Sequence, residues 1–300
     1  MKNIDSNKTD VINFIEEIRP NLLGLAYRLL GSMADAEDMV QDTFIKWDKT
    51  EQKAIENPKA WLTTVCTRCC LDQLRSASRT RVDYIGTWLP EPIQTSNDNE
   101  LIASIELAQS LTTAFLLMLE RLTPKERAAY LLYEIFDISY AEVAHTLQIK
   151  ETACRKLVSR AKSNVDQAKI RNSISAQKQE TFLNAFQLAV TSGEVSELTC
   201  LLAGDVKLNA DGGGKVPTIL KPIEGKDSVV TFIAESLKIY WANCQWEKVG
   251  INNSLGFSLK EENNITAILS FSYDKQGQVD GIFIMRNPEK INNFDEISIH

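Results

Sequence analysis

The chain has 300 residues and a net charge of −7, with 44% apolar and 24% charged residues, which is ordinary for a globular protein. This length predicts two or three domains. Spread evenly, the negative charge would argue against nucleic-acid binding, which needs local positive charge. No apolar run approaches the ~20 residues that span a bilayer, and the N-terminus lacks the apolar segment of a signal peptide. We therefore expect a cytoplasmic protein without membrane contact, whose six cysteines are free thiols.

The first 170 residues predict helices, because apolar residues recur at intervals of three and four. One helix is expected over 33–48, with an acidic face and a buried side formed by Val40, Phe44 and Trp47. Such an acidic face suits a basic protein partner or is simply solvated.

A second helix is expected from about residue 58 to 78, with an apolar side and a basic side. Aromatic and basic residues on one helix suit unstacked single-stranded DNA. Cys66, Cys69 and Cys70 fall on its apolar side, so we expect them to pack in the core rather than bind a metal.

A helix-turn-helix is the strongest local pattern. Capping boxes start at Thr123 and Ser139, and a short helix over 140–147 is followed by a turn and a third helix over 151–163. The third helix and the residue before it carry cations and hydroxyls that can contact phosphates or bases, at Lys150, Thr152, Arg155, Lys156, Ser159 and Arg160. The segment therefore predicts a helix that reads the major groove, although a solvated basic face is the alternative.

Between these helical parts, Gly86 and two prolines interrupt the helical pattern. The stretch 86–110 is expected to be a linker. Trp88 and Leu89 are unusually apolar for a free linker, so part of it should dock on a protein surface.

The last 125 residues change to alternating apolar and polar positions and predict an α+β domain, in which helices pack on a curved sheet. Helices are expected over 176–191, 194–202 and 226–240. Strands are expected over 204–210, 216–222, 243–250, 255–261, 264–273 and 279–286.

Three segments of the helical part resemble the sigma-70 family. DAEDMVQDTFIKW (35–47) is similar to the region that grips core RNA polymerase, and NPKAWLTTVCTRCCLDQLRS (57–76) to the region that melts and reads the −10 element. The helix-turn-helix is similar to the domain that reads the −35 element, with Gln148 where many relatives carry glycine. The short linker between the two parts is typical of the extracytoplasmic-function (ECF) group.

Three further motifs resemble ECF sigma factors fused to a SnoaL-like domain. They are WLPEP (88–92), DGGGK (211–215) and NPEKI (287–291), the last a variant of a motif that ends Asp-Lys-Leu. The resemblance implies two all-α sigma domains (1–85 and 111–172), the linker 86–110, and a SnoaL-like cone (173–300) that regulates the sigma part from within.

The resemblance also implies the site residues. Core polymerase would be bound by Asp35, Asp38, Gln41 and Asp42, and the −10 element by Asn57, Trp61, Arg68, Arg75 and Arg79. The regulatory contact would involve Trp88, Leu89, Pro90, Glu91, Pro92, Asp211, Gly212, Gly213, Gly214, Lys215, Asn287, Pro288, Glu289, Lys290 and Ile291. The expected partners are bacterial core RNA polymerase and promoter DNA. No metal or cofactor is expected.

Two alternatives stay open from the sequence. The C-terminal domain could be a ligand-binding or cyclase-like enzyme module, with Asp211 as its base, because the fold also hosts enzymes. Its aromatic residues could line a pocket for an unidentified small molecule or form plain core: Trp241, Trp246, Phe257, Phe271, Tyr273 and Phe283. A free-standing helix-turn-helix repressor is disfavoured by the acidic face of helix 33–48. GGGK lacks the other residues of a phosphate-binding loop.

The net charge divides unevenly along the chain. Residues 1–85 carry −1, the stretch 86–110 carries −4, residues 111–172 carry +3 and residues 173–300 carry −5. Only the part with the helix-turn-helix is basic, so the overall charge does not argue against DNA binding. An acidic C-terminal domain would oppose non-specific contact with DNA.

Overall fold

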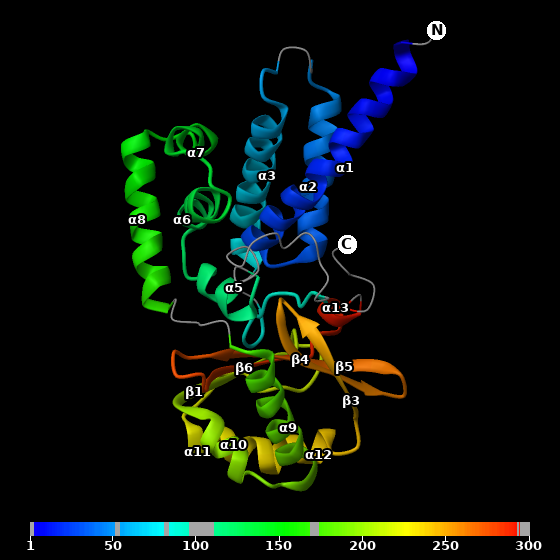
Figure 1. Cartoon of the computed structure of the whole chain (residues 1–300), viewed down its shortest axis with the longest axis vertical. Coiled ribbons are helices and arrows are strands. Elements are labelled where there is room, and N and C mark those ends of the chain that lie inside the picture. Colours follow the sequence, from blue (N-terminus) through cyan, green and yellow to red (C-terminus); the bar gives the residue numbers. More distant parts are fainter. Residues whose placement is uncertain are drawn as a thin grey trace. The chain divides into compact units, whose positions relative to one another are not determined.

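The computed structural model describes residues 3–51, 55–80, 84–95, 111–168, 174–292 and 294. The chain forms two compact units (Figure 1). The first unit contains residues 1–81 and 119–164, and the second contains residues 82–118 and 165–300. Among the described residues, no helix is long and apolar enough to cross a membrane.

The first unit opens with three helices, α1 (Asn3–Leu30), α2 (Met33–Asp48) and α3 (Pro58–Thr80). The expected bounds of α2 are confirmed, because the Ser32 hydroxyl caps its N-terminus and its buried residues recur every three or four positions. Trp47 packs its ring 5.5 Å from that of Trp61 on α3. The three cysteines of α3 are buried.

The helix-turn-helix follows in the same unit. Its elements are α6 (Pro124–Tyr130), continued by the π-helix η3 (Leu131–Ile135), then α7 (Tyr140–Leu147) and α8 (Glu151–Ala168). Both predicted capping boxes are present. Helix α8 runs five residues beyond its expected end, because no glycine or proline follows to stop it. Helix α6 is tied to α1 through Arg127, which is 3% exposed and donates to the Leu29 carbonyl at 2.6 Å.

Gln148 closes α7 in the left-handed region, with φ 54°. That conformation costs a residue with a Cβ about 1–2 kcal/mol, whereas glycine adopts it freely but loses more entropy on folding. Because the Gln148 side chain is exposed, we expect Gln148→Gly to raise the free energy of unfolding by about 0.5–1 kcal/mol. Thermal unfolding of the purified protein measures this, and Gln148→Ala, which keeps the Cβ, should show no gain.

The second unit is built on one six-stranded sheet in the order β2-β1-β6-β5-β4-β3. Neighbouring strands are antiparallel except β1 and β6, which are parallel. The strands are β1 (Leu202–Asp211), β2 (Ile223–Glu224), β3 (Gln245–Ile251), β4 (Ser254–Glu261), β5 (Asn264–Tyr273) and β6 (Val279–Met285). The helices are α5 (Thr113–Leu119), α9 (Ala176–Ser192), α10 (Ser196–Leu201), α11 (Lys226–Thr231), η4 (Phe232–Leu237), α12 (Lys238–Trp241) and α13 (Pro288–Ile291).

The two faces of this sheet carry different cores. Helices α9 to α12 cover one face (Figure 1) and enclose the larger cluster around Phe182, Phe186 and Phe271. The opposite face packs a smaller cluster that includes Leu89 of the linker, Ala114 of α5 and others. Alternation along each strand therefore fills both faces with apolar side chains.

The linker pairs with the edge of the sheet. Thr95 donates its N–H to the Gly250 carbonyl at 3.1 Å, and Asn252 donates its N–H to the Ile93 carbonyl at 2.9 Å. A β-bridge joins Gln94 to Ile251 on the outer strand β3. An edge strand exposes unpaired backbone groups, so the linker covers the C-terminal end of an otherwise open edge. The sequence predicts that part of this stretch docks on a protein surface, and the structure shows that this surface is the edge of the sheet at β3.

The expected strand over 216–222 is wrong. This segment is a loop, and only Ile223 and Glu224 pair with β1. Pro217 and Pro222 remove two backbone donors from the segment, and a strand cannot continue through them.

Candidate functional site

The predicted −35 residues lie together on one helix surface. Lys150 precedes α8, and the other five follow on the helix; all six are exposed. Arg155 pairs with Glu151 at 2.6 Å and lies 4.3 Å from the Tyr140 ring centroid. An exposed ion pair is worth 0–1 kcal/mol, so Arg155 can exchange Glu151 for a phosphate at little cost.

The predicted −10 residues are spread along α3. Asn57 caps the helix by accepting the Ala60 N–H at 3.1 Å, and Trp61 packs on Trp47. Arg75 pairs with Asp72 on the surface. The side chain of Arg79 lies outside the described residues.

Arg68, the remaining −10 residue, contacts the helix-turn-helix. Its guanidinium donates to the Thr146 carbonyl at 3.0 Å and to the His145 carbonyl at 3.1 Å, at the C-terminal end of α7. A hydrogen bond of 2.9 Å joins the hydroxyls of Thr64 and Thr146 beside it. Arg68, which the sequence predicts to bind DNA, therefore holds α3 against α7 within the first unit.

The predicted polymerase-binding residues lie on α2. Asp38, Gln41 and Asp42 are exposed, whereas Asp35 is half-buried and accepts a hydrogen bond from Gln73 at 3.3 Å. Three of the four are thus free to meet a protein partner, and Asp35 also helps to fix α3.

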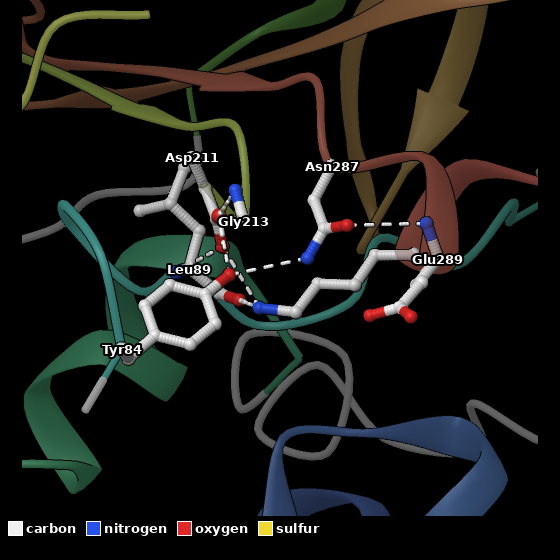
Figure 2. Close-up of polar contacts among 7 residues, drawn as sticks. Tyr84, Leu89, Asp211, Gly213, Asn287 and Glu289 are labelled. Carbon is white, nitrogen blue, oxygen red and sulfur yellow. Dashed lines mark hydrogen bonds and ion pairs between the residues drawn. The ribbon is translucent and has the colours of Figure 1, made fainter. Parts of the chain in front are cut away.

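The linker motif WLPEP and the two C-terminal motifs, DGGGK and NPEKI, meet around one buried carboxylate, Asp211 at the end of β1 (Figure 2). Its Oδ2 accepts the Leu89 N–H at 2.9 Å and the Lys290 ammonium at 2.8 Å. Its Oδ1 accepts the Gly213 N–H at 2.9 Å and the Tyr84 hydroxyl. The side chain of Asp211 is fully buried, so these four donors replace its water shell.

Lys290 completes the grip on the linker. Its ammonium also donates to the Leu89 carbonyl at 2.6 Å and lies 4.4 Å from the Trp88 ring centroid. Both backbone groups of Leu89 are therefore held by side chains of the C-terminal domain, while the Leu89 side chain is 1% exposed. We call Tyr84, Leu89, Asp211 and Lys290 the clasp.

Asn287 supports the clasp from NPEKI. Its amide donates to the Tyr84 hydroxyl at 3.2 Å, and its oxygen caps α13 by accepting the Glu289 N–H at 3.1 Å (Figure 2). Burial and the neighbouring Asp211 raise the pKa of Tyr84, so this phenol stays a neutral donor. Lys215 pairs with Glu289 and joins DGGGK to NPEKI at the surface.

Two glycines of DGGGK fit only without a side chain. Gly213 has φ +61°, and a Cβ there would lie 2.5 Å from the Asn287 amide. A Cβ on Gly212 would lie 2.6 Å from the Val216 carbonyl. The run of glycines thus lets the backbone approach Asp211 and Asn287 closely.

The other motif residues support the linker through packing. Pro90, Glu91 and Pro92 are buried, and Ile291 packs in the apolar cluster with Leu89. Pro288 begins α13. Sequence reasoning missed two residues that take part in holding the linker, Tyr84 and Asn252. No spacing rule marks them, because their partners lie more than 120 residues away.

A catalytic role for Asp211 is not supported by this geometry. A general base needs a lone pair directed at the substrate, whereas the Asp211 oxygens already accept four hydrogen bonds. The predicted aromatic residues have different surroundings. Phe257, Phe271 and Tyr273 lie in the larger core, and Trp246 packs against that core. Phe283 lies in the smaller cluster on the linker face, and Trp241 is both a core residue and part of a pocket wall.

Comparison with known proteins agrees with these features. The family model of sigma-70 region 2 matches residues 14–80, and that of sigma-70 region 4 matches residues 112–165. The ECF RNA polymerase sigma factor SigJ of Mycobacterium tuberculosis is 38% identical over 231 residues, which cover 76% of this chain and 74% of SigJ. The probable ECF sigma factor SigI of the same species is 30% identical over 250 residues, covering 73% of this chain and 83% of SigI.

The crystal structure of M. tuberculosis SigJ matches the fold, with a TM-score of 0.73 and 32% identity over 94% of this chain and 98% of that one. The match includes the six-stranded sheet domain together with both helical regions. The chain therefore belongs to the ECF sigma factors of the sigma-70 family, as an RNA polymerase sigma factor with a C-terminal SnoaL-like domain.

Proposed function

We propose that this sigma factor is restrained in cis by its SnoaL-like domain through the clasp. In this proposal residues 1–85 bind core polymerase through α2 and the −10 element through α3. Residues 111–172 read the −35 element with the exposed residues of α8. Residues 173–300 regulate, and no part of the chain performs covalent chemistry. The protein acts in the cytoplasm on core RNA polymerase and promoter DNA.

The contact between α3 and α7 supports a restrained state. By their numbering, the −10 and −35 elements lie about 25 base pairs apart, which is roughly 85 Å of duplex at 3.4 Å per base pair. Helices joined by the Arg68 hydrogen bonds cannot reach both elements at once. The first unit must therefore open before both elements are read.

The clasp supplies the means to favour the closed state. It fixes the backbone of Leu89, which lies in the only segment of chain that connects α3 to the helix-turn-helix. A linker held in this way has less reach than a free one, because reach depends on the number of unconstrained residues. This grip on Leu89 is the observation that carries the proposal.

Reconstituted transcription with Lys290→Met tests the restraint. Methionine keeps the apolar stem but removes the hydrogen bond to the Leu89 carbonyl and the ion pair with Asp211. A hydrogen bond from a charged group is worth about 1.5–3 kcal/mol. The linker should be released more often, and we expect about ten times more promoter-specific transcript per sigma factor in run-off assays with core polymerase.

Lys207→Met is the matched control. It removes an exposed ion pair with Glu224 on the same sheet, away from the linker, and should leave the transcript level unchanged. If folded Lys290→Met protein gives no more transcript than Lys207→Met, the clasp does not restrain the sigma regions.

A further inference from the structure

A pocket of about 310 Å³ opens in the C-terminal domain beside the end of β6. Phe232, Ile239 and Trp241 supply much of its apolar wall, from the helices that cover the larger core. Its volume falls at the lower end of the range of small-molecule sites, which is about 300–1,000 Å³. The pocket is therefore large enough for one small organic molecule.

Arg286 is the one charged residue among those that line the pocket. Its Nη1 donates to the Pro217 carbonyl at 2.7 Å, while its Nε is buried and has no hydrogen-bond partner among the described residues. A guanidinium has five N–H donors. A buried donor without an acceptor costs about 1–3 kcal/mol, and the cost is higher when the group is charged. Arg286 is therefore a pocket-lining cation whose donors the described residues do not all satisfy.

Hydroxyl groups accompany this cation. Thr218 and Ser236 line the same pocket and can each donate to an oxygen. No acidic side chain is among the lining residues. The lining thus combines one positive charge and a few polar groups with a mainly apolar wall.

The mouth of the pocket is unusually apolar for a protein surface. Ile239 is 78% exposed and Tyr240 is 64% exposed, and both line the pocket. Leu220, at 61% exposed, follows the lining residue Ile219. Apolar side chains that are exposed together at a pocket indicate a binding site, whereas single exposed apolar residues are common on any protein surface.

We propose that this pocket binds a small organic acid with a single anionic head group and an apolar body. The anionic oxygens would accept from the Arg286 guanidinium and from the nearby hydroxyls, and the body would lie against Trp241 and Phe232. Nucleotides and sugar phosphates fit poorly, because one guanidinium would face several negative charges and the wall offers few polar groups. A neutral apolar molecule would leave the Arg286 charge without a counter-ion in the pocket.

Decanoate and its neutral counterpart decan-1-ol test this assignment on the full-length protein. Each is titrated against the bound fluorescent anion 1-anilinonaphthalene-8-sulfonate, whose displacement reports occupancy. We expect wild-type protein to bind decanoate at least ten times more tightly than decan-1-ol. In Arg286→Gln the affinity for decanoate should fall at least tenfold while that for decan-1-ol is unchanged.

Ile239→Glu gives a second test that does not depend on Arg286. It places a negative charge at the exposed mouth, so decanoate should bind several times more weakly and decan-1-ol nearly as before. Leu188→Glu is the matched control, an exposed apolar residue of α9 that does not line the pocket, and should leave both affinities unchanged.

Three results would overturn the proposal. Decanoate could fail to displace the fluorescent anion from wild-type protein. Decanoate and decan-1-ol could bind equally well, which would show adventitious apolar binding only. The preference for decanoate could also survive in Ile239→Glu and in a folded Arg286→Gln protein.

Discussion

Asp211→Ala is expected to release the linker from the sheet. The substitution leaves the Lys290 ammonium, which has a side chain only 13% exposed, without its carboxylate, and it leaves the Leu89 and Gly213 N–H groups without their acceptor. Breaking a buried ion pair by removing one partner costs about 3–5 kcal/mol. In hydrogen–deuterium exchange, peptides covering residues 84–95 should then exchange more than about a hundred times faster.

Two companion variants separate the clasp from general loss of stability. Asp205→Ala removes an exposed carboxylate from the same strand and should leave exchange of the linker unchanged. Asp211→Ala combined with Lys290→Met removes both charges. Its loss of unfolding free energy should therefore be smaller than the sum of the two single losses, by about 0.5–3 kcal/mol. Unchanged exchange of residues 84–95 in Asp211→Ala would show that apolar packing alone holds the linker.

Arg155→Ala combined with Arg160→Ala is expected to abolish promoter-specific transcription. Both side chains are exposed on α8, and each arginine that pairs with a base or phosphate is worth about 1–3 kcal/mol. Losing both should lower the transcript at least about thirtyfold in a reconstituted assay. Binding to core polymerase, measured by co-elution, should not change, because the polymerase contact that we propose on α2 is untouched.

The matched control removes two positive charges elsewhere. Lys178→Ala combined with Lys221→Ala alters exposed residues of the second unit and changes the net charge by the same amount. Transcription should stay close to that of the wild type. If the α8 double variant transcribes as well as this control, α8 does not read the promoter.

Local signals explain what the sequence predicts well. Ser32, Thr123 and Ser139 each start a helix by binding a backbone N–H, and apolar periodicity fixes the buried faces. The loop over 216–222 shows the reverse case, because alternation there predicts a strand that two prolines forbid. In both cases the conformation follows from residues within the segment itself, the capping hydroxyls in the helices and the two prolines in the loop.

The clasp depends on contacts that the local pattern does not encode. Asp211 meets Tyr84 and Leu89 across more than 120 residues, and Leu89 takes part through its backbone, which every residue possesses. The resemblance of WLPEP and DGGGK to known motifs implies a contact, but not that Asp211 binds the backbone amide of Leu89. Gln148 is a different case, because the glycine of many relatives at this turn points to the left-handed φ that the structure shows.

The sheet unit is discontinuous in sequence, because residues 82–118 and 165–300 belong to it while 119–164 do not. Topologically, the helix-turn-helix is an insertion that leaves this unit and returns to it, with both ends anchored. Deleting everything after residue 172 would therefore do more than remove a regulator. It would expose the side chains of Leu89 and Ile93, which are buried in the full-length protein. The truncated chain would then carry an exposed apolar segment that favours aggregation. Loss of activity in such a fragment would report on its solubility as much as on regulation, so point changes in the clasp are the cleaner probe.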